Sequence, residues 1–185
     1  MRIHETDLPG VLIIEPRVFG DQRGFFMETW NQAGYAAAGL PENFVQDNLS
    51  CSRKGVLRGL HFQKPNSQGK LVYVLEGEVF DVAVDIRLGS PTFGQWASAV
   101  LSAENKRQFF IPPGFAHGFC VTSDRALFAY KCNDRYNPQA EGSVLWNDPD
   151  LSIPWPVGNP ELSGKDAQGV RLADIDISRL PNYER

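Results

Sequence analysis

The stretch KLVYVLEGEVFDVAVDIR, residues 70–87, determines the expected fold. Branched and aromatic side chains dominate both halves, as is typical of β-strands, and Gly77-Glu78 lies between them where a tight turn is needed. In the second half, alternate residues form an apolar set, Phe80, Val82, Val84 and Ile86, and a half-polar set, Asp81, Ala83, Asp85 and Arg87. The stretch therefore predicts a hairpin whose second strand has one apolar face and one half-polar, surface-like face.

Similar short β-rich runs, punctuated by Gly and Pro, recur along the rest of the chain. We expect further strands at 11–18, 24–30, 43–50, 57–63, 94–101, 107–111, 117–122, 125–132 and 142–147. Helical pattern is confined to the Ala-rich stretch 31–39 and to 173–180, and from about residue 148 the chain becomes Pro-rich. Many short strands separated by turns indicate a sandwich, jelly roll or barrel. We therefore predict one all-β domain over residues 1–185, with few short helices and a tail laid over the barrel.

Composition excludes several classes of function. The 185 residues carry a net charge of −4 without a Lys- or Arg-rich run, which disfavours nucleic-acid binding. No stretch reaches the ~18 apolar residues that a membrane helix requires. Cys51, Cys120 and Cys132 are odd in number and lack CxxC spacing, which is typical of reduced thiols. These features predict a cytoplasmic protein that binds neither nucleic acid nor membrane.

Two of the three histidines lie in aromatic, β-rich segments. Pro112-x-Gly114-x-x-His117 is similar to the second motif of the cupin superfamily, whose members are jelly-roll barrels. The first cupin motif normally offers His-x-His and then Glu, but this chain has His61-Phe62-Gln63 and no Glu before Lys70. A transition metal usually needs three or four His or anionic ligands. The pattern therefore predicts a cupin barrel that holds no metal, although a histidine in such a segment can also be a hydrogen-bonded core residue.

Several longer motifs occur in a fixed order. They are DQRGFFME (21–28), FVQDNLS (44–50), RGLHFQ (58–63), QGKL (68–71), DVAVDIR (81–87), GFAHGF (114–119), WNDP (146–149) and LSGKD (162–166). Together they resemble the dTDP-4-dehydrorhamnose 3,5-epimerase family over roughly residues 3–170. The resemblance implies a metal-free and cofactor-free isomerase that acts on a dTDP-linked 4-keto-6-deoxy sugar in dTDP-L-rhamnose biosynthesis.

The resemblance also implies roles for four catalytic residues. His61 is expected to remove the proton beside the ketone, with Asp166 orienting its ring. Tyr130 is expected to return a proton from the opposite face, and Lys70 to lie near the enolate oxygen. An imidazole is suited to this step because its ordinary pKa, about 6.5, is near neutral pH.

The remaining site residues implied by the resemblance bind the substrate. They are Arg23, Glu28, Gln46, Asp47, Asn48, Arg58, His117, Tyr136, Glu141 and Lys165. Guanidinium groups suit the pyrophosphate because each can bind two oxygens, and Tyr136 matches the position that stacks on thymine. In the family an N-terminal strand crosses between subunits, which implies a homodimer in which Arg23 and Glu28 serve the partner's site.

Other interpretations remain open from the sequence. A mono-epimerase of deoxysugar biosynthesis shares the same His, Asp and Tyr set, and a sugar-nucleotide ketoisomerase or a non-catalytic sugar-binding cupin is more distant. Arg23 and Glu28 can form a surface pair, and Tyr130 can be a core residue. Asp81 and Asp85 are interpreted as structural carboxylates at a strand edge.

Overall fold

The computed structural model describes residues 1–41 and 43–183. Its strands are β1 (Arg2–Glu5), β2 (Leu12–Glu15), β3 (Val18–Asp21), β4 (Gly24–Met27), β5 (Gln46–Arg53), β6 (Leu57–Gln63), β7 (Lys70–Glu76), β8 (Glu78–Asp85), β9 (Trp96–Ser102), β10 (Gln108–Ile111), β11 (Phe115–Val121), β12 (Arg125–Cys132) and β13 (Glu141–Ser143). The helical elements are α1 (Gln32–Ala36) and the 3-10 turns η1 (Asp166–Gln168), η2 (Leu172–Asp174) and η3 (Ile177–Arg179).

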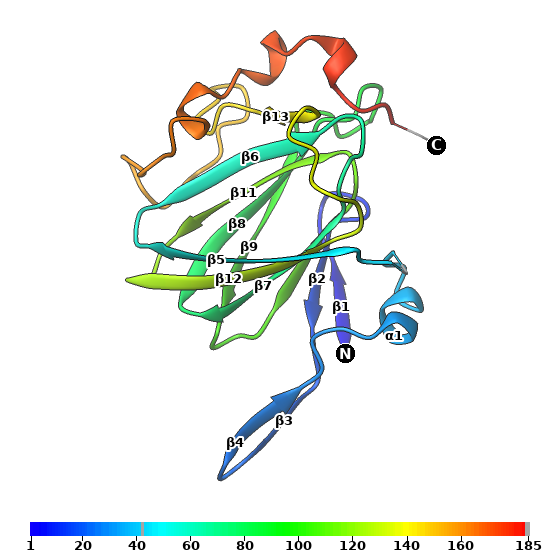
Figure 1. The fold of residues 1–185 in the computed structure, drawn as a ribbon, viewed down its shortest axis with the longest axis vertical. Helices are drawn as coiled ribbons and strands as arrows, with labels where there is room; N and C mark the ends of the chain where they lie inside the picture. The colour runs from blue at the N-terminus through cyan, green and yellow to red at the C-terminus, as the bar shows by residue number, and fades with distance from the viewer. Residues whose placement is uncertain (42, 184–185) are drawn as a thin grey trace.

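Two antiparallel sheets face each other and form the barrel (Figure 1). One has six strands in the order β1-β2-β10-β7-β12-β5, and the other has five in the order β13-β6-β11-β8-β9. Strands distant in sequence are neighbours in both sheets, as in a cupin jelly roll. The predicted all-β jelly-roll fold is confirmed.

Apolar side chains from both sheets fill one end of the space between them. Phe109 and Phe128 of the six-stranded sheet are almost fully buried there against Val79 and Phe119 of the five-stranded sheet. The Phe119 and Phe128 rings stack with centroids 4.1 Å apart. Burying one such side chain contributes about 1.5–3 kcal/mol, so this end of the barrel provides the stable core. The other end is left for polar residues.

Segments outside the barrel cover the outer faces of the sheets. Trp30, α1 with its Tyr35, and Phe44 pack on part of the six-stranded sheet beside Phe110. The C-terminal segment lies over β13 and β6 (Figure 1) and inserts Leu172 and Leu180 into a second apolar cluster. The predicted tail over the barrel is therefore present, and it runs across the sheet that carries β6.

Both predicted helices are shorter than expected. In 31–39, Asn31 caps α1 by accepting a hydrogen bond from the Gly34 amide at 2.7 Å, but the helix ends at Ala36. Gly39, at φ +84°, has a left-handed conformation that ends helical structure soon afterwards. The stretch 173–180 forms no α-helix and contains parts of η2 and η3 instead.

Two predictions about strands are corrected. The run 24–30 is strand only to Met27, and it pairs with β3 in a separate two-stranded hairpin that projects from the barrel (Figure 1). The half-polar face of β8 was expected at a surface, yet Asp81 and Asp85 are fully buried and face the interior. The predicted alternation of β8 is correct, but its half-polar face points into a polar part of the interior and not toward solvent.

Among the described residues, no helix is both long and apolar enough to cross a membrane.

Candidate active site

A cavity of about 280 Å³ opens between the two sheets at the polar end of the barrel. Its lining residues are Gln46, Asn48, His61, Phe62, Gln63, Gln68, Lys70, Phe115, Tyr130, Tyr136 and Glu141. Ligand pockets usually measure about 300–1,000 Å³ and hold a few converging polar groups. A cavity of this size suits a single sugar ring better than a complete sugar nucleotide.

The backbone around His61 is unusually close to the neighbouring strand. His61 on β6 is directly opposite His117 on β11, and the register between these strands shifts just beyond this pair. Gly59 has φ +136°, and a Cβ atom there would lie 2.4 Å from the Cα of Gly118. Only glycine fits at this contact, which fixes where β6 delivers His61 to the cavity.

The His61 ring forms a hydrogen-bonded pair with Asp166. Its Nε2 lies 2.5 Å from Asp166 Oδ1, and the ring remains partly exposed to the cavity. Burial raises the pKa of Asp166, but hydrogen bonds from His61 and Ser163 outweigh it and hold that pKa below the ordinary value. The Ser163 hydroxyl donates to Asp166 Oδ2 at 2.7 Å, and the Gly59 amide donates to Oδ1 at 3.4 Å. An ionised carboxylate held by three donors can orient an imidazole and stabilise its protonated form.

Lys70 and Tyr130 occupy the opposite wall, on β7 and β12 of the six-stranded sheet. Burial lowers the pKa of Lys70, although the nearby Cys132 and Asp81 act in the opposite direction. Burial raises the pKa of Tyr130, so its phenol is protonated near neutral pH. One wall therefore carries a base with its orienting carboxylate, and the other carries a phenol and an amine.

A polar group lies at the mouth of the cavity. Glu141 accepts a hydrogen bond from the Tyr136 hydroxyl at 2.7 Å and forms an ion pair with Lys165. Burial raises the pKa of Glu141, but its bonds to Lys165 and Tyr136 bring it below the ordinary value. The Tyr136 amide donates to Gln46 Oε1 at 2.9 Å, which joins this group to β5. The Tyr136 ring is half exposed and can offer a flat face to a ligand.

Comparison with known proteins agrees with this geometry. The family model described as dTDP-4-dehydrorhamnose 3,5-epimerase matches residues 5–174. The chain belongs to this family. A dTDP-4-dehydrorhamnose 3,5-epimerase of Shigella flexneri is 58% identical over 178 residues, covering 95% of this chain and 98% of the relative. The family resemblance of the sequence motifs is thus confirmed.

Solved structures of epimerases share the whole fold. The dTDP-6-deoxy-D-glucose-3,5-epimerase of Legionella pneumophila, in complex with dTDP-4-keto-L-rhamnose, is 56% identical with a TM-score of 0.97, covering 100% of this chain and 99% of that one. A 3'-monoepimerase from Streptomyces bikiniensis, in complex with dTDP-quinovose, is 34% identical with a TM-score of 0.91. The match covers 97% of this chain and 93% of that one. The fold is common to both reaction types, and this chain is more similar in sequence to the double epimerase.

In this member of the 3,5-epimerase family, His117 lies behind the cavity wall. It is 6% exposed and does not line the cavity. Its Nε2 lies 2.9 and 3.1 Å from the two oxygens of Asp81, which is fully buried. Burial lowers the pKa of His117 and raises that of Asp81.

Of three other predicted substrate-binding residues of this family member, Asp47 and Asn48 lie on β5 and Arg58 lies on β6. Asn48 lines the cavity, and its amide donates to Cys132 Sγ at 3.7 Å. Asp47 points to the opposite side of the strand, where it pairs with Lys131 at 2.9 Å. The Arg58 Nε donates to the Ser52 hydroxyl at 3.1 Å, away from the cavity lining.

Arg23 and Glu28 are not brought to the cavity of their own chain. Arg23 lies at the turn of the β3–β4 hairpin and pairs with Asp21 at 2.6 Å, with 85% of its side chain exposed. Glu28 follows β4 and accepts a hydrogen bond from the Asn31 side chain. The β3–β4 hairpin, which carries Arg23 at its turn, projects from the barrel (Figure 1), and Glu28 lies just beyond the end of β4.

The sequence predictions missed several residues of the site. Gln63 and Phe115 line the cavity, and each is two positions from a predicted histidine on the same strand. Because alternate strand residues share a face, this spacing was an available signal. Gln68 lies in a loop and Ser163 contacts only Asp166, so neither carries such a signal.

No set of three or more His, Cys, Asp or Glu side chains within residues 1–41 and 43–183 is grouped so that it could hold a metal ion.

Proposed function

We propose that this protein inverts carbons 3 and 5 of dTDP-4-keto-6-deoxy-D-glucose to give dTDP-4-keto-L-rhamnose. The observation that carries the proposal is the arrangement of the cavity, in which the His61–Asp166 pair faces Tyr130 and Lys70 from the opposite sheet. Inversion of a carbon requires removal of a proton on one face of the sugar ring and its return on the other. Two facing walls with a base and an acid meet this requirement.

The first step breaks the C–H bond beside the ketone. His61 takes the proton on Nδ1, because its Nε2 is already bonded to Asp166, and the electron pair moves through the carbonyl to leave an enolate oxygen. Asp166 stabilises the imidazolium that forms. General-base catalysis of this kind typically contributes about 10²–10⁴ in rate.

The opposite wall completes the reaction. The Lys70 ammonium stabilises the enolate oxygen at carbon 4, and such a donor is often worth about 3–4 kcal/mol in the transition state. Tyr130 then gives its phenolic proton to the carbon from the other face. The tyrosinate regains a proton from water, and the His61 imidazolium releases its proton to water, so both groups are restored for the second carbon. Carbons 3 and 5 both flank the ketone, so one enolate-stabilising group serves both centres.

The nucleotide extends beyond the cavity in this proposal, because the cavity suits the sugar ring alone. Tyr136 stacks on the thymine, with Glu141 and Lys165 beside it at the mouth. Arg58 binds the pyrophosphate as a two-pronged donor. The cavity-lining amides of Gln46 and Asn48 are hydrogen-bonded to each other at 3.0 Å, and they bind the sugar and its linkage, whereas Asp47 and His117 lie outside the cavity lining and act on the substrate only through their neighbours.

Hydrogen exchange tests the reaction. The protein is incubated with dTDP-4-keto-6-deoxyglucose in D₂O with EDTA, and proton NMR follows carbons 3 and 5. We expect exchange at both carbons, and none in the His61→Ala variant. His4→Ala, in which the altered histidine pairs with Glu15 at the surface, is the matched control and should behave as wild type. Exchange at one carbon only would favour the mono-epimerase and refute the double inversion.

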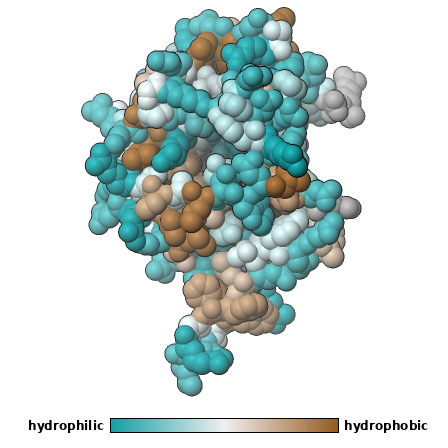
Figure 2. Space-filling model, viewed as in Figure 1, coloured by the Kyte–Doolittle hydropathy of each residue, from teal (hydrophilic) through white to brown (hydrophobic). Residues whose placement is uncertain are grey.

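The proposal includes a homodimer that exchanges the β3–β4 hairpin. The hairpin exposes Phe19, Phe25 and Phe26 at 50%, 59% and 70%, and Leu49 on edge strand β5 is 62% exposed. Figure 2 shows brown and tan side chains gathered at the base of the hairpin and over β5 and β12. Contiguous exposed apolar surface of this kind usually marks an interface. A partner that covers the hairpin would receive Arg23 near its own cavity.

Mixed dimers test this assembly. Arg23→Ala and His61→Ala are each expected to be inactive alone. Co-expressed, they should recover about a quarter of wild-type activity, because half the dimers are mixed and each mixed dimer has one intact site. A monomer in sedimentation analysis, or no recovery in the mixture, would refute the exchanged hairpin.

A cytoplasmic location completes the proposal. Cys51, Cys120 and Cys132 are free thiols in the structure, which supports a reducing compartment. Fractionation of cells that produce the tagged protein tests this assignment.

A further inference from the structure

Asp81 is a buried carboxylate that the proposed mechanism does not use. It exposes none of its surface, and its two oxygens lie 2.9 and 3.1 Å from His117 Nε2. Removing a carboxylate from water is costly unless strong partners compensate, and an apolar pair of similar volume often stabilises a core at least as well. Stability alone therefore does not account for this pair in the barrel.

The pair lies directly behind the reacting groups. In the sheet, His117 is opposite His61, whose strand β6 is the next one to β11. Across the interior, the His117 ring stacks over Phe128, with centroids 6.3 Å apart and planes at 18°. Phe128 in turn contacts the Tyr130 ring at 5.9 Å. The orientation of His117 is thus linked by packing to both the base and the acid.

Charge also links Asp81 to the opposite wall. The charged and titratable groups that act on the pair are Lys70 from β7 and His61 from β6. Lys70 is buried, and the negative charge of Asp81 favours its ammonium form. Without that charge, burial would lower the pKa of Lys70 further and weaken the preference for the ammonium form that stabilises an enolate.

We propose that Asp81 is a positioning residue of the epimerase reaction, holding His117 in the tautomer protonated on Nε2 and keeping Lys70 cationic. This inference rests on the proposed function. A neutral His117 that donates Nε2–H to Asp81 carries an unprotonated Nδ1, so the pair fixes which ring nitrogen can accept a hydrogen bond. Asp81 acts through these two neighbours and does not touch the substrate.

The Asp81→Asn variant tests the proposal because it removes the charge at nearly constant volume. We expect kcat to fall at least about tenfold with a small change in KM, because the nucleotide contacts lie elsewhere. We also expect the alkaline limb of the kcat profile to move about one pH unit lower, since Lys70 loses the charge that favours its protonated form.

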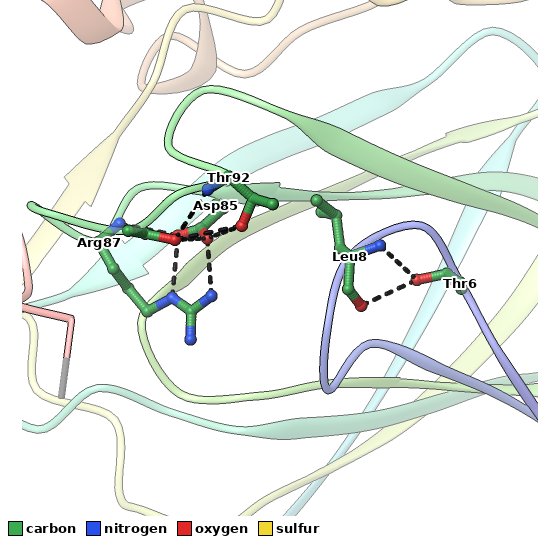
Figure 3. Close-up of polar contacts among 6 residues, drawn as sticks. Thr6, Leu8, Asp85, Arg87 and Thr92 are labelled. Carbon is green, nitrogen blue, oxygen red and sulfur yellow. Dashed lines mark hydrogen bonds and ion pairs between the residues drawn. The ribbon is translucent and has the colours of Figure 1, made fainter. Parts of the chain in front are cut away.

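Asp85→Asn is the matched control. Asp85 lies four residues further on β8 and is equally buried, but it is bonded to Arg87, Ser90 and Thr92. Figure 3 shows its carboxylate enclosed by Arg87 and Thr92 in this separate cluster. The control is expected to lose stability without moving the alkaline limb. If both variants shift the limb equally, or if Asp81→Asn keeps the wild-type kcat and profile, the proposal is overturned.

A spectroscopic measurement covers the case in which Asp81→Asn does not fold. Nitrogen-15 NMR of histidine-labelled wild-type protein, with His117→Gln used for assignment, should show His117 neutral and protonated on Nε2. Protonation on Nδ1 would overturn the proposal. The outcomes separate this proposal from the proposed function. Wild-type protein without exchange activity would refute the reaction itself. An active wild type whose kcat and pH profile are unchanged by Asp81→Asn would refute only the positioning role of Asp81.

Discussion

Replacing Asp166 with asparagine should reverse the tautomer of His61, the proposed base. The Asp166 side chain is 5% exposed, and its Oδ1 lies 2.5 Å from His61 Nε2. The Oδ2 atom already accepts from Ser163 at 2.7 Å, and an asparagine that keeps this bond turns its NH₂ group toward His61. The ring must then leave Nε2 unprotonated, which places the proton on Nδ1, the atom that has to accept the substrate proton.

The expected loss follows from this geometry. The variant loses most of the general-base contribution, about 10²–10⁴ in kcat. At about 1.4 kcal/mol per tenfold change, the barrier rises by roughly 3–5 kcal/mol. KM should change little, because the predicted nucleotide contacts at Tyr136 and Arg58 are untouched. The fold should persist, since asparagine matches aspartate in size and keeps the Ser163 bond.

The assay is the rate of deuterium incorporation at carbons 3 and 5 under saturating substrate. Asp176→Asn is a suitable control, because Asp176 is an exposed carboxylate in the same C-terminal segment whose hydrogen bond goes to the Ser178 amide at 2.8 Å. Wild-type kcat in Asp166→Asn, within about threefold, would refute the role of the pair. An equal loss in Asp176→Asn would show that the segment, and not the tautomer, is responsible.

Three further outcomes are expected. In Tyr130→Phe, His61 still removes a proton, so deuterium should enter at the original configuration while product formation falls by about 10²; unchanged product formation would exclude the phenol as the acid. Burial lowers the pKa of Lys70, so kcat should fall as the pH rises through a pKa below the ordinary ~10.4 of lysine. Lys70→Arg should remove this alkaline limb from the pH-rate profile. Gly59→Ala places a Cβ 2.4 Å from the Cα of Gly118 at φ +136°, so denaturant titration should show at least ~3 kcal/mol of lost stability, and a loss under 1 kcal/mol would contradict the close approach.

The sequence predicted the strands well where local pattern and packing agree. The β-rich stretches 57–63 and 125–132 form β6 and β12 with the predicted bounds. The Ala-rich stretch 31–39 fails as a long helix because Gly39 adopts a left-handed conformation soon after Ala36 and because the segment is held mainly by packing of Trp30 and Tyr35 on the sheet. Helix propensity summed over nine residues is a weak guide to helix length when tertiary packing holds the segment.

The polar face of β8 shows the limit of pattern reasoning. Alternation identifies two faces of a strand, but it does not say which face is inside when the interior holds a polar cavity. Asp81 was therefore interpreted as structural. Its partner His117 is 36 positions away in sequence, and only the β8–β11 pairing brings the two together.

The His61–Asp166 pair also depends on a contact between segments that are distant in sequence. His61 and Asp166 are 105 positions apart, and no local pattern in the polar loop at 162–166 indicates a buried carboxylate. That loop reaches β6 because the C-terminal segment beyond it inserts Leu172 and Leu180 between its own turns and the five-stranded sheet. The Asp166 carboxylate must be placed to within about 0.5 Å to orient His61. Its position therefore depends on the burial of Leu172 and Leu180, several residues further along the chain. A substitution that empties either leucine site should therefore reduce catalysis through the His61–Asp166 distance, although neither leucine lines the cavity.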